Sequence, residues 1–293
     1  MRIGRILDID IHISKYLLLL VAVFLITGRS GNLTAIFFIL LVHEMSHVVA
    51  ARLLKLKVYE IELLPFGGAV KIQSLFELNP VHEILVAAAG PLSNILLLLF
   101  YFGGIQAGWL PVSKPDQDFV NINLLLAGFN LLPALPLDGG RILRAVLARH
   151  MGIKRATQIA SGMGLLLALA LATAGLYGLY YRVFNYSLFI LSGFLVYAAA
   201  KERRNATYVM LKDITYKKES LLKEGSMPIR NIAVLSGVPL RDVVKKFVPQ
   251  RYHYIQVLDE QLREKGCLNE SQIVNGILDY GAHVQVGRLL KKQ

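Results

Sequence analysis

Residues 33–54 read LTAIFFILLVHEMSHVVAARLL, an apolar run with three ionisable side chains, His43, Glu44 and His47, near its centre. A helix of about 20 mostly apolar residues can cross the hydrocarbon core of a bilayer. An ionisable side chain inside such a span is costly unless it faces a partner, a cavity or a metal. The stretch therefore predicts a membrane helix with a polar site built into it.

The composition of the whole chain also indicates a membrane protein. Of its 293 residues, 55% are hydrophobic and 18% are charged, and the mean hydropathy is +0.50. Soluble domains carry about 25% charged residues, so disordered, collagen-like and disulfide-rich secreted classes are excluded. Cys267 is the one cysteine, so no intrachain disulfide forms and the soluble parts are expected in a reducing compartment.

Six apolar runs are long enough to be candidate spans, so we expect an α-helical polytopic membrane protein. No cleavable signal peptide is evident, because Asp8 and Asp10 precede the first run, His12 lies at its start, and no A-x-A site follows it. The candidates are residues 11–27, 33–54, 84–102, 119–135, 159–181 and 186–200, the fourth of them broken by Pro133 and Pro136.

Lysine and arginine residues alternate between the two sides of these spans, which predicts that both termini are cytoplasmic. The net charge of +12 is then a topology signal, and no nucleic-acid partner is expected. The cytoplasmic side contains Arg2, Arg5 and Lys15; Arg52, Lys55, Lys57 and Lys71; Arg141, Arg144, Arg149, Lys154 and Arg155; and Lys201, Arg203 and Arg204, whereas the other side contains Arg29, Lys114 and Arg182.

A polar tail follows the last span and predicts a small cytoplasmic α/β domain. We expect a core at 1–200, a linker at 201–224 and the tail domain at 225–293. Within the tail, the pattern predicts strands at 229–234 and 254–258 and a helix at 240–247. His150, His253 and His283 are expected at the surface, and His12 and His82, near span ends, at the membrane interface.

The pattern His43-Glu44-Met45-Ser46-His47 carries the candidate chemistry. Residues four apart lie on one face of a helix, so both imidazoles can bind one zinc ion and Glu44 can act as general base. One alternative is a polar group that only holds helices together. Another is an ion path in a transporter, although such folds often carry paired repeats and this chain has one copy of the motif.

The stretch from Asn130 to Arg141, NLLPALPLDGGR, offers a third ligand. Its prolines interrupt helical hydrogen bonding and its glycines permit a tight turn. Irregular backbone at membrane depth is tolerated where it faces protein or a wet cavity, so Asp138 is a candidate ligand. Asp138 can alternatively be the N-cap of the helix that follows.

These motifs, over about residues 1–200, resemble the site-2 protease family of intramembrane zinc metalloproteases. The resemblance rests on HExxH at 43–47, on Asp-Gly at 138–139, and on Asn130 in its Asn-x-x-Pro context. Residues 64–68, LPFGG, are similar to the family's membrane hairpin, and residues 89–94, AGPLSN, to its Gly-Pro-x-x-Asn segment.

The resemblance implies a zinc metalloendopeptidase of regulated intramembrane proteolysis. His43, His47 and Asp138 would bind Zn²⁺ and Glu44 would be the catalytic base. Asn130 would lie near the substrate or the developing oxyanion, or would cap the break in its own helix. Substrate-binding residues would be Phe66, Gly67 and Gly68, which can add an unwound peptide as a strand or can simply fill space.

The tail resembles a single degenerate CBS domain, which implies homo-oligomers and ATP or another adenine nucleotide as a ligand. The alternatives are an α/β domain that only oligomerises or docks substrate, and a catalytically silent nucleotide sensor. A CBS-like tail on a six-span core resembles the family members that process a membrane-bound sigma-factor precursor during sporulation. That implies the precursor as substrate, inhibitory membrane proteins as partners, and the mother-cell membrane around the forespore as location; a different membrane-tethered regulator, such as an anti-sigma factor, is the alternative substrate.

Overall fold

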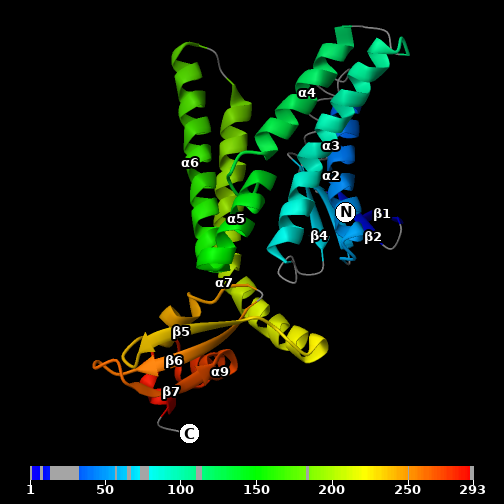
Figure 1. The fold of residues 1–293 in the computed structure, drawn as a ribbon. Coiled ribbons are helices and arrows are strands. Elements are labelled where there is room, and N and C mark those ends of the chain that lie inside the picture. The colour runs from blue at the N-terminus through cyan, green and yellow to red at the C-terminus, as the bar shows by residue number, and fades with distance from the viewer. Residues whose placement is uncertain are drawn as a thin grey trace. The chain divides into compact units, whose positions relative to one another are not determined.

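A computed structural model describes residues 2–6, 9–13, 33–56, 58–64, 67–72, 79–109, 114–182, 185–249 and 251–290 (Figure 1). The chain divides into two units. The first contains Met1–Leu143 and Ala160–Ala199, and the second contains Arg144–Ile159 and Ala200–Gln293. Helices α5, α6 and α7 therefore contribute residues to both units.

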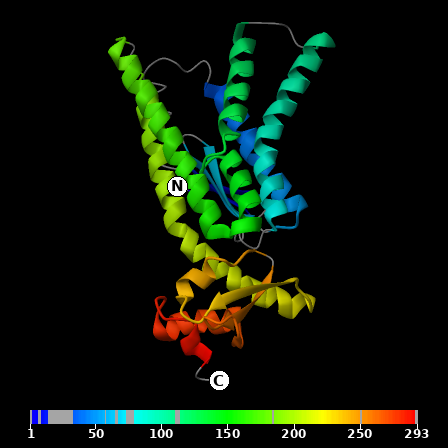
Figure 2. The same ribbon diagram turned by 60° about the vertical axis from the view of Figure 1, so that its left-hand side comes forward.

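The first unit combines a small sheet with long helices. The sheet has the order β1-β2-β3-β4, in which β2 and β3 are parallel and the outer pairs are antiparallel. Strand β4 contacts α2, and α3 packs against both α2 and α4 (Figures 1 and 2). In chain order, the elements that lie wholly in this unit are β1 (Arg2–Ile6), β2 (Ile9–Ile13), α2 (Leu33–Leu53), β3 (Val58–Leu64), β4 (Gly67–Ile72), α3 (Pro80–Gln106) and α4 (Lys114–Asn130).

Three of the described helices are long and apolar enough to cross a membrane. They are Ala35–Leu53 within α2, Pro80–Gln106 (α3) and Ile153–Tyr180 (α6). These correspond to three of the six expected spans. Expected span four becomes α4, which ends at Asn130 before the two prolines, and span six forms the start of α7 (Tyr186–Glu224).

The expectation for the first span, residues 11–27, is wrong at its start. Residues 11–13 belong to β2, which pairs with β1 and β3. The alternation of apolar and polar residues in IDIHI suits a strand better than a helix. Residues 14–27 lie outside the described part of the chain, so six spans remain a prediction.

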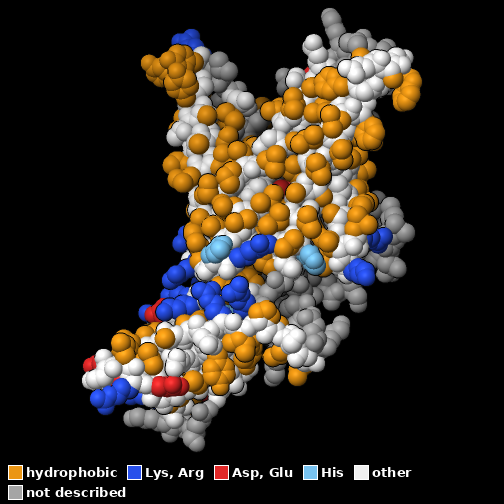
Figure 3. Space-filling view, in the orientation of Figure 1, with side chains coloured by type: hydrophobic (Ala, Val, Ile, Leu, Met, Phe, Trp, Pro, Cys, Tyr) orange, Lys and Arg blue, Asp and Glu red, His pale blue; other side chains and the backbone are white. Residues whose placement is uncertain are grey.

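The exterior of the helices is more apolar than a water-facing surface would be. Phe100 on α3 and Leu166 on α6 expose 77% and 67% of their surfaces. Figure 3 shows hydrophobic side chains spread over the helices of the first unit. Polar residues such as Asn94 and Asn123 are instead fully buried. This arrangement suits helices that face lipid.

An irregular segment between α4 and α5 (Asp138–Met151) is fixed against α6. The amide of Leu135 donates a hydrogen bond to the carbonyl of Ala160 (3.0 Å). Gly164, one turn further along α6, leaves room for this approach, because a Cβ there would lie 2.1 Å from the Leu135 carbonyl oxygen. The segment thereby sets where α5 begins and where Asp138 lies.

The second unit contains a three-stranded sheet, order β5-β6-β7, in which β5 and β6 are parallel and β6 and β7 antiparallel. The expected strands at 229–234 and 254–258 are confirmed, whereas the expected helix at 240–247 ends earlier, at Val244. Residues 201–224, expected as a linker, are helical within α7. The elements that follow α7 are β5 (Ile229–Leu235), α8 (Leu240–Val244), β6 (Tyr252–Leu258), β7 (Glu264–Asn269), α9 (Glu270–Tyr280) and α10 (Gly287–Leu290).

His253 was expected at the surface, and the structure shows that this is wrong. Alternate residues of β6 face the core of the tail, so His253 is buried in line with Ile255 and Val257. Its Nδ1 contacts the carboxylate of Glu270, which also lies 3.5 Å from the buried ammonium of Lys217. The core accepts this polar group because its partners are buried with it. His150 and His283 are exposed, as expected.

Candidate metal centre

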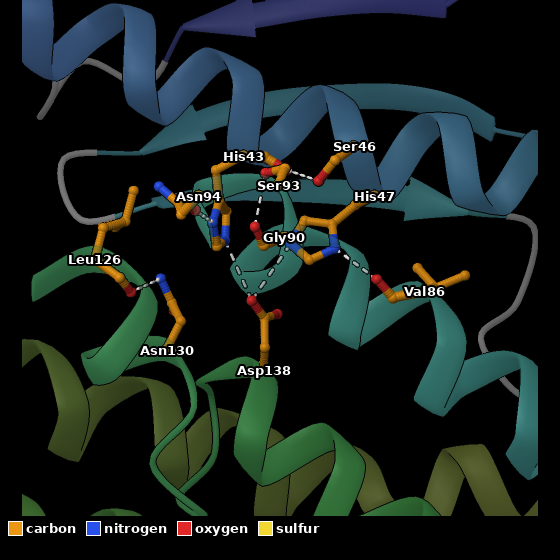
Figure 4. Close-up of polar contacts among 10 residues, drawn as sticks. All are labelled: His43, Ser46, His47, Val86, Gly90, Ser93, Asn94, Leu126, Asn130 and Asp138. Carbon is orange, nitrogen blue, oxygen red and sulfur yellow. Dashed lines mark hydrogen bonds and ion pairs between the residues drawn. The ribbon is translucent and has the colours of Figure 1, made fainter. Parts of the chain in front are cut away.

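The two histidines of α2 point their Nε2 atoms at one carboxylate. Their ring centroids are 5.0 Å apart, as expected for residues one helical turn apart. His43 Nε2 lies 3.2 Å from Asp138 Oδ2, and His47 Nε2 lies 3.4 Å from the same oxygen (Figure 4). All three residues are buried. The structure thus brings the three predicted ligand residues together.

The spacing of these atoms fits a zinc ion. Ligand atoms held at about 2.0–2.2 Å from a tetrahedral ion lie roughly 3.3–3.6 Å from one another. The two measured distances of 3.2 and 3.4 Å are close to that edge length. Two imidazoles and one carboxylate are also the ligand types that zinc accepts, and three protein ligands leave a fourth position open. His43, His47 and Asp138 could therefore hold Zn²⁺.

The second ring nitrogen of each histidine is held by helix α3. His43 Nδ1 lies 2.6 Å from Asn94 Oδ1, and His47 Nδ1 lies 2.7 Å from the carbonyl oxygen of Val86. Both oxygens are acceptors, so each Nδ1 carries the proton and donates it. Each Nε2 is then left with a lone pair for a metal.

Asn94 is itself oriented by helix α4. Its Nδ2 donates to Asn123 Oδ1 (3.0 Å), and Asn123 Nδ2 donates to the carbonyl of Phe119 (2.9 Å). The chain of hydrogen bonds thus runs from α4 through α3 to His43 on α2. Asn94 appeared in the sequence only as part of the family's segment, and Asn123 was not identified. The available signal was an amide within an apolar helix, which must find a buried partner.

Gly90 allows α3 to pass directly against both imidazoles. A Cβ at this position would lie 2.5 Å from His47 Nε2 and 2.6 Å from His43 Nε2. Real Cβ atoms essentially never make contacts under 3.0 Å, so no other residue fits here without displacement. The glycine of the AGPLSN segment is therefore required by the ligand geometry.

Asp138 is placed by the chain folding back on itself. It is the first residue of α5, and a Cβ on the next residue, Gly139, would lie 2.1 Å from the carbonyl oxygen of Leu131. A Cβ on Gly140 would lie 2.3 Å from backbone atoms of Ala134 and Leu135. The two glycines let the irregular segment pack on the start of α5, which directs the carboxylate toward α2 (Figure 4).

The remaining predicted site residues are less closely tied to this centre. Glu44 is buried beside the ligands on α2, with 4% of its surface exposed. Asn130 Nδ2 donates to the carbonyl of Leu126 (3.1 Å) within its own helix, and its role in the site stays a prediction. Gly67 and Gly68 begin β4, where they pair with Leu64 and Leu63. Phe66 lies outside the described residues.

The site and its setting define a class of protein: one with helices long and apolar enough to cross a membrane, and with a buried candidate metal site formed by the two histidines of an HExxH helix and an aspartate of α5. Residues 32–111 and 112–171 match the family described as Peptidase family M50. A zinc metalloprotease of Methanocaldococcus jannaschii is 33% identical over 208 residues, which are 68% of this chain and 58% of that protein. Stage IV sporulation protein FB of Bacillus subtilis is 29% identical over 212 residues, 70% of each chain.

A solved structure agrees with these sequence matches. The site-2 protease from Methanocaldococcus jannaschii aligns with a TM-score of 0.56 and 29% identity, covering 69% of this chain and 94% of that one. The chain belongs to the site-2 protease family of zinc metalloproteases, peptidase family M50. It spans little more than half the length of the M. jannaschii relative in the sequence match.

Proposed function

We propose that this chain is an intramembrane zinc metalloendopeptidase that cleaves a membrane-associated protein. The observation that carries the proposal is the convergence of two Nε2 atoms and a carboxylate oxygen at tetrahedral spacing beside an HExxH glutamate. Zinc held there would polarise the peptide carbonyl and acidify the attacking water. Glu44 would accept the proton of that water and later deliver it to the leaving amine.

The test compares zinc content and cleavage in matched variants of the full chain. We expect Glu44→Gln to retain about one zinc per chain and to lose cleavage, because glutamine cannot accept the proton. His43→Ala should lose both zinc and cleavage, whereas His283→Ala, at an exposed tail position, should lose neither. Cleavage that survives in Glu44→Gln would contradict the assigned base. Wild-type protein without zinc would contradict the metal site.

The substrate would bind as an added strand on β4. A helical peptide shields its carbonyls in hydrogen bonds, so it must unwind before water can attack. Strand β4 supports this role because it lies at an edge of the sheet order. In this proposal Phe66, Gly67 and Gly68 contact the unwound peptide.

Paired proline variants can test strand addition. Neighbouring residues of a strand direct their N–H groups to opposite sides, so one of Gly68 and Ala69 faces β3 and the other faces outward. Proline at the outward position should impair cleavage and leave zinc content unchanged. Full cleavage by both Gly68→Pro and Ala69→Pro would refute binding along β4.

The substrate class we favour is a sigma-factor precursor. Its support is the similarity to Stage IV sporulation protein FB and the tail that follows the core. Co-expression with a sporulation-type precursor and, separately, with a membrane-tethered anti-sigma factor distinguishes the two substrates, with Glu44→Gln as control in each case. Cleavage of the anti-sigma factor alone would replace the first assignment. Inhibitory membrane proteins and the membrane around the forespore belong to this same proposal.

The organisation of the chain is proposed as six spans with both termini cytoplasmic and a CBS-like tail at residues 225–293. The basic residues on alternate sides of the spans support the orientation. Reporter fusions after each span would test it, and a signal from the non-cytoplasmic side for a fusion at the C-terminus would overturn it. Homo-oligomers and binding of ATP at the tail are tested by light scattering and by nucleotide titration of the full chain.

A further inference from the structure

A cavity of about 380 Å³ lies within the second unit. The end of α5, the first turn of α6, strand β5 and the residues after α8 form its walls. Five of the described residues that line it are basic: His150, Arg155, Arg230, Lys245 and Lys246. Among the described lining residues none is acidic and none is Phe, Tyr or Trp. The cavity is therefore strongly cationic.

The basic groups are only partly balanced by acidic neighbours. Lys245 Nζ lies 2.5 Å from Asp242 Oδ1, so that ammonium is paired. Among the side chains that the structure describes, no carboxylate lies within 4.0 Å of the charged nitrogens of Arg155, Arg230 or Lys246. Like charges that share one cavity repel one another, and an anion among them relieves that repulsion.

A close backbone contact joins two of the segments that line the cavity. Gly152 joins α5 to α6 with φ +81°, and a Cβ there would lie 2.4 Å from the carbonyl oxygen of Phe247. The turn between the two helices therefore packs directly against the segment that carries Lys245 and Lys246. Both cationic walls are fixed by this packing.

Arg155 places one wall of the cavity at the end of a candidate membrane helix, where the available anions include lipid headgroups. Arg155 is the third residue of α6, and α6 is one of the three helices suited to cross a membrane. The first turn of a helix favours anions through its free N–H groups and its dipole. Figure 3, in the orientation of Figure 1, shows Lys and Arg side chains gathered near the lower ends of α5 and α6, with hydrophobic side chains further along α6.

We propose that this cavity binds the phosphate of an anionic membrane-lipid headgroup. A cluster of basic side chains at the membrane end of a span is suited to such headgroups. The volume of the cavity lies within the usual range of small-ligand sites, roughly 300–1,000 Å³. The absence of aromatic side chains from the described lining favours a phosphate group over a nucleotide base, which binds by stacking.

Native mass spectrometry of the detergent-solubilised full chain can test the proposal. The protein is loaded with phosphatidylglycerol or with phosphatidylcholine, and retained lipid is counted. We expect wild type to retain phosphatidylglycerol preferentially. The double variant Arg230→Gln with Lys246→Gln should bind it about 30-fold more weakly, about fivefold for each charge removed.

Two controls separate a local site from a general charge effect. Arg263→Gln with Lys265→Gln removes the same charge from exposed tail positions outside the cavity and should bind as wild type does. Arg230→Lys retains the charge and should retain most of the binding. Equal weakening in the Arg263/Lys265 variant, or no headgroup preference in wild type, would overturn the proposal.

Inorganic pyrophosphate distinguishes a soluble phosphate from a lipid. If millimolar pyrophosphate leaves the bound phosphatidylglycerol in place, the lipid assignment is supported. If pyrophosphate displaces the lipid and raises the Tm of wild type but not of the Arg230/Lys246 variant, the cavity takes a soluble anion and the lipid assignment is wrong.

Discussion

Replacing Gly90 with alanine should remove zinc from the protein without unfolding it. The new Cβ would lie 2.5 Å from His47 Nε2, whereas ordinary contact begins at 3.4 Å. The His47 ring must therefore retreat by about 0.9 Å, and His43 by nearly as much. Zinc sites tolerate about 0.2 Å of error in ligand distance. We expect metal affinity to fall by at least roughly 100-fold, the upper end of losses seen when partners of the ligands are removed.

The same substitution should favour the helix itself. Alanine stabilises a helix interior by about 1 kcal/mol relative to glycine. Gly103 provides the matched control, because it lies on the same helix and a Cβ there meets nothing within 4 Å. Gly103→Ala should share the gain in helix stability and keep its zinc.

Zinc content after dialysis against a graded series of chelator concentrations gives the affinity of each variant. Thermal unfolding in excess chelator compares the stability of the metal-free proteins. We expect Gly90→Ala to lose zinc at chelator concentrations that leave wild type and Gly103→Ala loaded. Wild-type zinc affinity in Gly90→Ala would refute the reasoning, because the imidazoles could not then lie against α3.

Three further predictions follow from the buried polar contacts. Asn94→Ala removes the acceptor for His43 Nδ1 and should weaken zinc binding by about 10- to 100-fold, measured by chelator competition; unchanged affinity would exclude an orienting role. Lys217→Met leaves the Glu270 carboxylate without its ammonium and should destabilise the tail by about 3 kcal/mol, measured by hydrogen exchange of β5–β7 amides; wild-type exchange would show that the pair contributes nothing. Burial lowers the pKa of His253 despite the opposing carboxylate of Glu270, so the unfolded chain binds a proton more readily. The free energy of unfolding of the tail should then be greatest above about pH 6.5 and fall as the pH drops below it, and equal protection factors at pH 7.5 and 5.5, corrected for the intrinsic exchange rate at each pH, would contradict this.

The sequence predicted the parts of the site that depend on local spacing. His43 and His47 share a helix face because they are four residues apart, and Asp138 was singled out by the irregular backbone around it. The break in the fourth apolar run also follows from Pro133 and Pro136. In each case residues close in sequence determine the structure.

The parts that the sequence did not predict depend on residues far apart in the chain. Asn123 is understood only once α4 lies beside α3 and its amide meets Asn94. His253 of β6 is buried together with Glu270 of α9, which it contacts, and with Lys217 of α7, which contacts Glu270. The β1–β2 pair was not predicted because its alternating residues run directly into the apolar stretch that was expected as the first span. Hydropathy and local propensity carry no information about such pairings.

The distance between the ligands along the chain has a consequence for biosynthesis. His43 and Asp138 are 95 positions apart, whereas the His43 partner Asn94 follows after 51. At about 5–20 residues per second, Asp138 leaves the ribosome roughly 5–20 s after His43. Helix α3 can orient the two imidazoles during that interval, before the carboxylate arrives. Zinc binding by all three residues is then a late step in assembly. Until Asp138 is synthesised, the nascent chain offers zinc only the two histidine nitrogens.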